Sequence, residues 1–421
     1  MSILRNPSLA SVLVAELVSL TGTAMTYVAL PWFVLITTGS TAKMGWVLAA
    51  ELLPIGLLGI PAGTLIARLG AKRTMNLADA ARAPLMAAVP VLHWTGHLSF
   101  PLLLAFTFLI GCFAAPYYAS SRLILPEVVG DDEQLVAQGS AFVQAATQLT
   151  QLGGPILGGL LIAWISAPAV LVIDAATYAF SFLVIATFVR AGKPVAPDES
   201  SRGVFAGLRY VLRDRVLRPM LAAAAVINFV AQALFGAIPV LVLRRYDADP
   251  KILGFCFAAF GGGALLGSLV AAQVVRKVPL LKLAGLAILG MALPLWFLAI
   301  AMPWPAVIFV LGAFGFCAPL VNAPVLAILT TRPPAALRPK VMTAVMTISV
   351  IIGPLGFLAV GQSLQYVGIT TVFLVSAAAF TAGALAFSAA ALRGEADGEE
   401  EPDTVPSRDR ATVLPAEART D

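Results

Sequence analysis

Long apolar runs follow one another along almost the whole chain and are separated by short polar segments. A helix needs about 20 mostly apolar residues to cross the roughly 30 Å hydrocarbon core of a bilayer. Backbone N–H and C=O groups cannot stay unpaired in lipid, so such runs must form helices. The pattern predicts an all-α membrane protein with twelve transmembrane helices, at 9–37, 44–66, 74–94, 100–124, 138–164, 168–190, 216–243, 252–275, 280–302, 305–330, 341–366 and 369–392.

Polar segments divide these helices into two groups of six. The segment 191–215 predicts a cytoplasmic linker between an N-terminal six-helix bundle (1–190) and a C-terminal six-helix bundle (216–392). Residues 393–421 are rich in Glu, Asp, Pro and Arg and poor in apolar residues, which predicts a disordered cytoplasmic tail.

The two bundles are related in sequence. Ala-Leu-Pro-Trp-Phe-Val-Leu at 29–35 matches Ala-Ile-Pro-Val-Leu-Val-Leu at 237–243, and Gly-Pro at 154–155 matches Gly-Pro at 353–354. Each match falls in the corresponding helix of its half. Parallel repeats of this kind place a substrate site between the halves near the membrane midplane, where it is reached from alternate sides.

Composition supports a lipid environment, because 59% of the residues are hydrophobic and only 12% are charged, against about 25% charged in soluble domains. The basic residues lie in short loops rather than on one basic face, which argues against a nucleic-acid partner. With the N-terminus inside, the basic residues predicted in the outer loops are few. They are Lys43, Arg244, Arg245 and Lys251.

The sequence shows no motif typical of a metal site, a cofactor site or an enzyme active site. Cys112, Cys256 and Cys317 lie singly in apolar runs, and His93 and His97 share one short loop, so no ligand spacing for a metal is present. The sequence also contains no nucleophile–base set and no phosphate-binding Gly-rich loop. We therefore expect neither an enzyme nor a bound cofactor.

Residues 63–73, Gly-Thr-Leu-Ile-Ala-Arg-Leu-Gly-Ala-Lys-Arg, lie between the second and third predicted helices. They resemble the signature loop of the major facilitator superfamily, G-x-L-a-D-R-x-G-r-[KR]-[KR]. The matching positions are Gly63, Arg68, Gly70, Lys72 and Arg73. The resemblance implies that the glycines let two helices approach closely and that the basic residues hold the loop at the inner surface. The Asp with which the family latches its inward-closed state is Ala67 here, so Arg68 needs another partner, and Asp79 and Glu127 are the candidates.

The fifth predicted helix contains Gly154-Pro155-Ile-Leu-Gly158-Gly159. This resembles the G-P-x-x-G-G core associated with the antiporter branch of the superfamily, and a proline flanked by glycines makes a helix that can bend and pack closely. Further similarities extend over nearly the whole chain apart from the tail.

The combination is similar to the bacterial drug-efflux group that holds macrolide-efflux proteins, the enterobactin exporter and Tap-type multidrug pumps. It implies a monomeric antiporter in the bacterial inner membrane, with protons, membrane lipid and a small lipophilic substrate as its partners.

Ionisable groups inside a transmembrane helix are costly, so each indicates a functional site. Asp79 and Arg82 are three residues apart on one helical face and are expected to form a structural ion pair. Asp174 is followed by Thr177, Tyr178 and Ser181, which could satisfy its carboxyl group. It is either a structural group or a proton carrier.

Glu16 and Glu51 have no basic residue within their own helices, and the resemblance puts both helices along the transport path. An unpaired carboxyl group in a medium of low dielectric constant binds a proton more readily than in water, as a proton carrier must. We expect Glu51 or Glu16 to carry the proton, with Asp174 as the next candidate. The alternative is a protonated carboxyl group bonded to a neighbouring helix.

Other polar residues inside the helices indicate either a substrate path or interhelical hydrogen bonds. They are Thr23, Tyr27, Gln144, Gln148, Gln151, Asn228, Gln232 and Asn322. A cavity with apolar walls, scattered amides and no cationic residue suits lipophilic solutes, whether neutral or cationic. It suits sugar phosphates and dicarboxylates poorly.

Three functions compete for this sequence. The leading hypothesis is proton-coupled export of lipophilic small molecules such as antibiotics or secondary metabolites. A lipid or lysolipid translocator on the same fold would not depend on Glu16 or Glu51. A non-transporting receptor is disfavoured, because the linker and the tail are both too short to hold a folded signalling domain.

The asymmetry of basic residues generates a test of topology. We expect cysteines introduced as His97→Cys or Asp247→Cys to react with a membrane-impermeant thiol reagent added outside the cell. A cysteine introduced as Ser200→Cys should stay unlabelled, because both termini, the linker and the 68–73 loop face the cytoplasm. Labelling of position 200 alone would overturn the twelve-helix topology.

Overall fold

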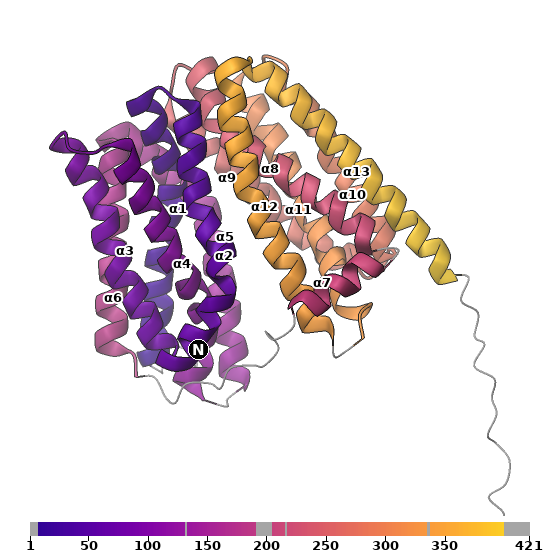
Figure 1. Cartoon of the computed structure of the whole chain (residues 1–421), viewed down its shortest axis with the longest axis horizontal. Helices are drawn as coiled ribbons and strands as arrows, with labels where there is room; N and C mark the ends of the chain where they lie inside the picture. The colour runs from indigo at the N-terminus through magenta and orange to yellow at the C-terminus, as the bar shows by residue number, and fades with distance from the viewer. Residues whose placement is uncertain (1–6, 131–132, 191–203, 215–216, 335–336, 400–421) are drawn as a thin grey trace, which may run out of the picture.

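The computed structural model describes residues 7–130, 133–190, 204–214, 217–334 and 337–399, and these residues form thirteen helices and no strand (Figure 1). The helices are α1 (Pro7–Thr38), α2 (Thr41–Leu69), α3 (Ala71–Trp94), α4 (Phe100–Val129), α5 (Glu133–Ile165), α6 (Ala167–Phe188), α7 (Val204–Arg213), α8 (Leu217–Arg245), α9 (Pro250–Val274), α10 (Leu280–Leu298), α11 (Trp304–Thr331), α12 (Arg338–Tyr366) and α13 (Ile369–Glu399). The all-α fold predicted from the sequence is confirmed.

Twelve of these helices coincide with the twelve predicted spans, and α7 lies within the predicted linker. In the described part of the chain, eleven helices are long and apolar enough to cross a membrane. The twelfth, α3, is the least apolar of the set because its interior carries Asp79 and Arg82. It packs between α4 and α6 inside the N-terminal bundle.

The predicted tail begins too early. Helix α13 continues past residue 392 to Glu399, because Ala391, Leu392, Arg393 and Glu395 are good helix formers that can extend a helix beyond the lipid. Residues 191–203 and 400–421, on which most of the linker and tail predictions fall, lie outside the described residues.

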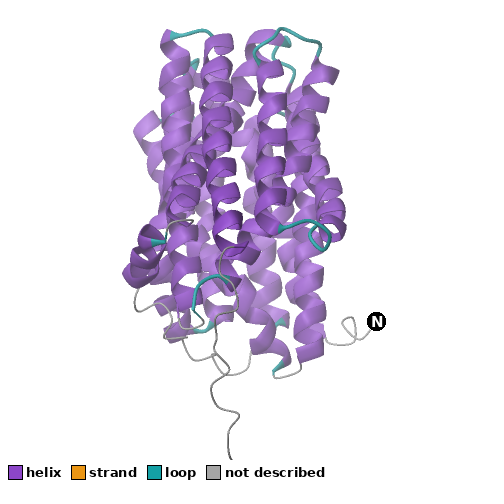
Figure 2. Ribbon diagram, turned by 90° about the vertical axis from the view of Figure 1, so that its right-hand side faces the viewer, coloured by secondary structure: helices purple, strands orange, loops and turns teal. Residues whose placement is uncertain are grey.

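Two bundles stand side by side with their helices roughly parallel to one axis (Figures 1 and 2). Helices α1–α6 form the first bundle and α8–α13 the second. The bundles meet at the top of Figure 1 and diverge toward the bottom, where α1 begins and α7 lies. We call the end where the bundles meet the closed end; it carries the α1–α2 and α8–α9 connections.

At the closed end, α2 of the first bundle crosses α12 of the second at two glycines. A Cβ atom on Gly45 would lie 2.5 Å from the carbonyl oxygen of Phe357 and 3.1 Å from the Cα of Gly361. The hydroxyl of Thr41 donates a hydrogen bond of 2.8 Å to the Gly361 carbonyl. The backbones therefore touch directly, with no room for a side chain between them.

A second crossing joins α5 and α9 in the same way. A Cβ atom on Gly159 would lie 2.6 Å from the carbonyl oxygen of Pro250, and one on Gly254 would lie 2.6 Å from that of Pro155. Since α9 and α12 occupy in the second half the places of α2 and α5 in the first, the two crossings are equivalent under the internal repeat.

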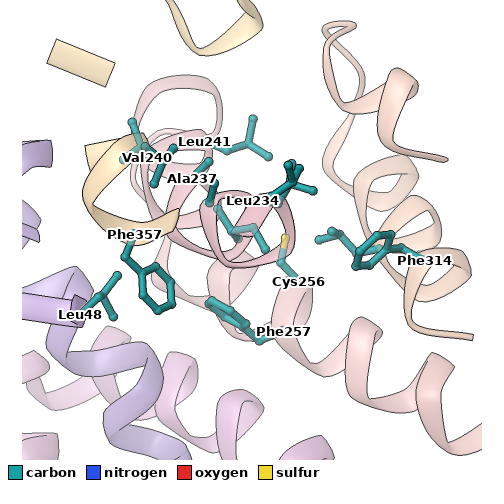
Figure 3. Close-up of a cluster of buried hydrophobic side chains, with 14 of the residues drawn as sticks. Leu48, Leu234, Ala237, Val240, Leu241, Cys256, Phe257, Phe314 and Phe357 are labelled. Atoms are coloured by element: carbon teal, nitrogen blue, oxygen red, sulfur yellow. The ribbon is translucent and has the colours of Figure 1, made fainter. Parts of the chain in front are cut away.

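The apolar core continues from one bundle into the other near these crossings. Figure 3 shows Leu48 of α2 beside Phe357 of α12, with Phe257 and Cys256 of α9 close by. Cys256 is fully buried and its thiol is free. It serves as a small apolar side chain of the core.

Helix α7 belongs with the second bundle. It packs against α12 and α8, and Val211 is buried there. Asp214, just after α7, forms an ion pair of 3.3 Å with Arg332 at the end of α11 and accepts a hydrogen bond of 2.8 Å from the backbone N–H of Leu217. These contacts fasten α7 to the end of the bundle opposite the closed end.

The interior of the first bundle holds the ion pair expected between Asp79 and Arg82. Both side chains are buried, with exposed fractions of 0% and 1%. The guanidinium carbon of Arg82 lies 4.1 Å from the ring centre of Tyr117 and 4.3 Å from that of Tyr178, so the cation is held between two aromatic faces. The pair and the two rings join α3, α4 and α6.

The other glycines of the Gly-Pro segment pack α5 against α1. A Cβ atom on Gly154 would overlap the methyl group of Ala24, and one on Gly158 would lie 3.1 Å from the backbone Cα and O of Met25. Gly153 differs, because a Cβ atom there meets nothing within 4 Å. The segment is thus a packing surface on two sides, toward α1 and toward α9.

We expect Gly158→Leu to lower the free energy of unfolding by about 1–3 kcal/mol, because the new side chain meets fixed backbone atoms. It should also impair the transport predicted from the sequence while the chain remains inserted. Gly153→Leu is the matched control and should change little. Thermal melting of purified protein and an efflux assay measure the two effects; equal behaviour of the two variants would show that close packing at Gly158 is unimportant.

We expect Asp79→Asn to reduce the yield of folded protein strongly, because it leaves the buried Arg82 cation without a counter-charge. Breaking a buried pair from one side costs about 3–5 kcal/mol. Asp214→Asn, which breaks the partly exposed pair with Arg332, should cost about 0–1 kcal/mol. Fluorescence-detected size-exclusion chromatography compares the two, and similar yields would contradict a structural role for the buried pair.

Candidate functional site

A cavity of about 450 Å³ lies between the two bundles, at the inner limit of the α5–α9 crossing. On the α5–α9 side, a Cβ atom on Gly261 would still lie only 3.0 Å from the carbonyl oxygen of Gln151, and both residues line the cavity. The lining residues are Leu20, Thr23, Ala24, Tyr27, Tyr118, Thr147, Thr150, Gln151, Pro155, Phe235, Phe257, Phe260 and Gly261. They come from α1, α4 and α5 of one half and from α8 and α9 of the other.

Aromatic rings form the wall contributed by the second bundle. Phe257 stacks on Phe235 with 6.0 Å between ring centres and meets Tyr27 of α1 edge to face at 5.5 Å. Phe260 meets Phe235 edge to face at 4.8 Å. None of the described residues that line the cavity is charged. The cavity can therefore bind a flat apolar molecule through ring contacts and a few hydroxyl and amide groups.

A larger hollow of about 710 Å³ lies at the closed end, between α1, α3, α5 and the α8–α9 connection. Its lining includes Trp94 and Lys251, both exposed, and the ring of His93, which packs edge to face on Phe33 at 4.9 Å. The hollow does not include the buried carboxyl groups of the helices. The central cavity is therefore the better candidate site.

The structure brings three of the predicted path residues to the cavity wall: Thr23, Tyr27 and Gln151. The others do not line it. Gln232 instead packs against Gly353 of α12, and Asn228 is half-buried elsewhere on α8. Gln144 and Asn322 are exposed and Gln148 is half-buried. Their roles in transport stay predictions.

Several cavity residues were not singled out from the sequence. Tyr118, Thr147 and Thr150 supply hydroxyl groups, and Phe257 and Phe260 supply rings. Thr147 and Gln151 are four residues apart on α5, a spacing that could have marked them as one face. The phenylalanines gave no such signal, because many other phenylalanines in the chain face lipid or the core.

Asp174 of α6 is completely buried behind the cavity wall. The hydroxyl of Thr26 donates a hydrogen bond of 2.6 Å to its carboxyl group, and that of Thr177 donates one of 3.1 Å. Gly22 is required here, since a Cβ atom at that position would overlap Asp174 and Thr177. Of the three neighbours expected to satisfy the carboxyl group, Thr177 and Tyr178 interact with it, whereas Ser181 interacts with Asp79 instead.

A short polar link joins Asp174 to the cavity. The hydroxyl of Tyr178 interacts with the Asp174 carboxyl group and lies 3.1 Å from the hydroxyl of Thr23, which lines the cavity. Tyr178 itself is 2% exposed. The Tyr178 phenol and the Thr23 hydroxyl thus lie between Asp174 and the cavity.

Glu51 and Glu16 differ in their surroundings. Glu51 of α2 is half-buried, close enough to Tyr27 and Asp174 to interact electrostatically, and its carboxyl group makes no hydrogen bond among the described residues. Glu16 is 3% exposed and lies near Ser121 of α4, and one of its carboxyl oxygens has no hydrogen-bond partner in that same part of the chain. It does not line the cavity, because the cavity meets α1 only further along, at residues 20–27.

The signature loop is tied to its own bundle. Gly70 has a φ of 82°, which favours glycine, and separates α2 from α3. The carboxyl group of Glu127 accepts hydrogen bonds from the backbone N–H groups of Ala71 (2.8 Å) and Lys72 (3.4 Å) at the start of α3. The Lys72 ammonium donates a hydrogen bond of 2.6 Å to the carbonyl of Val189, just beyond α6. An anion at a helix start and a cation at a helix end are the favourable placements.

Two expectations for this loop are wrong. Arg68 is exposed and pairs with neither Asp79 nor Glu127, because Arg82 takes the first and backbone N–H groups take the second. Gly63 makes no close helix contact, since a Cβ atom there would meet nothing within 4 Å. Arg73 is exposed, as expected for a residue at the membrane surface.

No group of three or more His, Cys, Asp or Glu residues that could hold a metal ion occurs among the described residues.

Comparison with known proteins agrees with this architecture. The sequence profile of the Major Facilitator Superfamily matches residues 12–357. The chain is 29% identical over 381 residues to "Multidrug efflux pump Tap" of Mycobacterium tuberculosis, covering 87% of this chain and 89% of that protein. It is 28% identical over 375 residues to the Tap pump of Mycolicibacterium fortuitum, covering 86% and 90%.

Solved structures show the same fold at low sequence identity. The nucleoside transporter NupG superposes with a TM-score of 0.75 at 14% identity, covering 91% of this chain and 98% of that one. A D-xylose-proton symporter superposes with a TM-score of 0.68 at 14% identity, covering 90% and 97%. With a profile match over most of its length and the two-bundle fold around a central cavity, the chain belongs to the major facilitator superfamily and is a multi-pass membrane transporter rather than an enzyme.

Proposed function

We propose that this transporter exports lipophilic small molecules, such as antibiotics or secondary metabolites, in exchange for protons. The observation that carries the proposal is the central cavity, with its wall of aromatic rings, its few hydroxyl and amide groups and no charged side chain among the described lining residues. The similarity to pumps named for multidrug efflux supports the same substrate class.

The cavity suits neutral or cationic substrates better than anionic ones. Its walls offer no Lys or Arg to an anion within the described lining. Two acidic groups, Glu51 and Asp174, interact electrostatically with the lining residues Tyr27 and Tyr118, and the nearby Arg82 cation is already paired with Asp79. A carboxylate on one side of the cavity and aromatic rings on the other attract a lipophilic cation without fixing its orientation. Such a site tolerates molecules of different shapes.

Alternating access requires the crossings at the closed end to separate. At present α2 is held to α12 by the Gly45–Gly361 contact and α5 to α9 by the Gly159–Gly254 contact. Opening the cavity on this side means moving both pairs apart. Among the described residues, the contacts involved are close backbone packing, apolar packing such as Leu48 against Phe357, and single hydrogen bonds, with no ion pair. Such contacts can be broken and remade at low cost.

Proton coupling would use the buried carboxyl groups Glu51, Glu16 and Asp174. Each lies in the first bundle and is buried or half-buried. Neither glutamate makes an ion pair in the described part of the chain, and the only basic group electrostatically linked to Asp174, Arg82, is already paired with Asp79. A carboxyl group without a permanent counter-charge can gain and lose a proton during the cycle.

The proposed setting is the bacterial inner membrane, with both termini in the cytoplasm and the protein acting as a monomer. In that orientation the closed end faces outward and the diverging end faces the cytoplasm. The substrate would then enter from inside the cell, and export would follow when the closed end opens.

We expect neutralisation of the proton carrier to abolish uphill efflux while binding survives, because a protonated carboxyl group and an amide have nearly the same shape. A pH gradient of one unit can sustain about a tenfold substrate gradient per proton exchanged, and a variant that cannot couple should sustain none. The variants are Glu51→Gln, Glu16→Gln and Asp174→Asn. Ethidium accumulation in proteoliposomes with an imposed pH gradient measures the effect.

Asp249→Asn, at the half-buried residue that caps the start of α9, is the matched control and should keep full coupling, because an amide oxygen can still accept the hydrogen bond from the Lys251 N–H. If all three variants at the buried positions move ethidium uphill as well as the unaltered protein does, proton coupling through them is wrong. Translocation of a lysolipid by all three at normal rates, with no ethidium transport by any protein tested, would instead support a lipid translocator.

A further inference from the structure

The Tyr178 hydroxyl occupies a position between the cavity and the only carboxyl group that is fully enclosed by hydroxyl neighbours in the described structure. On one side it lies 3.1 Å from Thr23 Oγ1, and on the other it interacts with the Asp174 carboxyl group. Its ring lies on the Arg82 guanidinium, which fixes the direction in which the phenol points. The phenol therefore stands between the Asp174 carboxyl group, with which it interacts, and the Thr23 hydroxyl at the cavity wall, and we call these three groups the polar chain.

Which group donates and which accepts in this polar chain depends on how many hydroxyl and carboxyl hydrogens the three groups carry. Thr23 has one hydroxyl hydrogen and two acceptors within reach, the Ser19 carbonyl at 3.0 Å and the Tyr178 oxygen at 3.1 Å. If Thr23 donates to Ser19, then Tyr178 must be the donor to Thr23, and its oxygen is left to accept a hydrogen from a protonated Asp174. If Tyr178 donates to an ionised Asp174, its oxygen is free to accept the hydrogen of Thr23.

We propose that Tyr178 couples proton binding at Asp174 to substrate binding at Thr23 by reversing the direction of this chain. With Asp174 ionised, the chain runs from Thr23 through Tyr178 to the carboxylate, so Thr23 becomes a strengthened acceptor for an N–H or O–H group of the substrate. With Asp174 protonated, the chain runs the other way and ends at the Ser19 carbonyl, and this strengthening is lost. The proton on Asp174 comes from water; Tyr178 and Thr23 only rotate their hydroxyl groups and break no covalent bond.

This inference rests on the proposed function and adds a substrate feature to it, a hydrogen-bond donor that reaches Thr23. A proton bound to Asp174 then weakens the binding of a donor-bearing substrate at Thr23, and the substrate weakens proton binding, as exchange requires. The proton and the substrate nevertheless bind to different groups. A substrate without a donor would gain nothing from the ionised state beyond its general electrostatic attraction.

Other charged and titratable groups near Asp174 must be kept constant in any test. They are Arg82 and its partner Asp79 on α3, Tyr118 on α4, Glu51 on α2 and Tyr178 on α6 itself. The Arg82–Asp79 pair carries no net charge and serves to position Tyr178. Glu51 interacts electrostatically with Asp174, so the measurements are made in a Glu51→Gln background.

Two permanently charged cations distinguish an effect of the hydrogen-bond direction from plain charge attraction to the Asp174 carboxylate. Ethidium carries aromatic amino groups that donate hydrogen bonds, and tetraphenylphosphonium carries no N–H or O–H group. We expect the affinity for ethidium of the purified, detergent-solubilised protein to rise with pH, over about pH 5–9, by about three- to tenfold more than the affinity for tetraphenylphosphonium. Fluorescence polarisation measures ethidium binding, and equilibrium dialysis measures binding of the other cation.

Tyr178→Phe should remove this extra pH dependence and leave ethidium with the same profile as tetraphenylphosphonium. Tyr117→Phe is the matched control: Tyr117 holds the opposite face of the Arg82 guanidinium, but in the described structure its hydroxyl interacts with Ser19 and with neither Asp174 nor Thr23. It should keep the full effect. Thr23→Val should behave as Tyr178→Phe does, and combining the two changes should add nothing further. Retained tetraphenylphosphonium binding verifies that each variant is folded.

Two results would overturn the inference while leaving the proposed function intact. One is an unchanged difference between the two cations in Tyr178→Phe, and the other is an identical pH profile for both cations in the starting protein. If neither cation binds at any pH, the proposed preference for lipophilic cations fails, and the inference fails with it.

Discussion

Direct contact between helix backbones is the constraint on which this structure depends. Lipid offers no hydrophobic drive for helices to associate, so two helices hold together by close packing and by hydrogen bonds. At Gly45 and Gly361, and again at Gly159 and Gly254, carbonyl oxygens lie where a side chain would have to be. These crossings join the bundles at the closed end, and the cavity lies between the bundles at the inner limit of the α5–α9 crossing.

The two bundles share a fold but differ in their interiors. The first bundle buries Glu16, Asp79, Arg82 and Asp174, whereas the buried polar residues of the described second bundle are limited to Ser376 and Ser388. Buried charge must be paired or hydrogen-bonded, and in the first bundle hydroxyl groups of α1, α4 and α6 surround it. The second bundle contributes rings to the cavity instead. Ionisable chemistry and the apolar wall are therefore separated between the halves.

The arrangement of helices was predictable from the sequence, and the environment of individual polar residues was not. Apolar runs mark eleven of the helices directly, and the pairing of Asp79 with Arg82 follows from their spacing alone. Glu16, Thr23 and Tyr27 share one stripe of α1, yet only the last two reach the cavity, because α4 covers the helix at Glu16. Which residues on one face of a helix are covered by a neighbouring helix depends on where the two helices cross. That crossing cannot be read from a single sequence.

The packing of individual glycines was likewise not predictable from the sequence, as Gly63 and Gly159 show. Both belong to motifs that resemble those of the superfamily, but only Gly159 lies against another backbone, whereas Gly63 is exposed. A glycine is needed only where a neighbouring chain passes within contact distance, and that neighbour, Pro250 or Gly254 in this case, lies in the other half of the chain.

The separation of the ionisable groups in the first bundle from the aromatic cavity wall in the second affects how such a transporter can evolve. Phe235, Phe257 and Phe260 can be exchanged for other apolar residues, which alters the shape of the cavity without disturbing the hydroxyl groups and carboxylates of the first bundle. Under the proposed function, selection by a new toxic compound can therefore act on one half of the molecule while the candidate proton carriers in the other half are preserved. Variants with an altered resistance profile should arise first in α8 and α9.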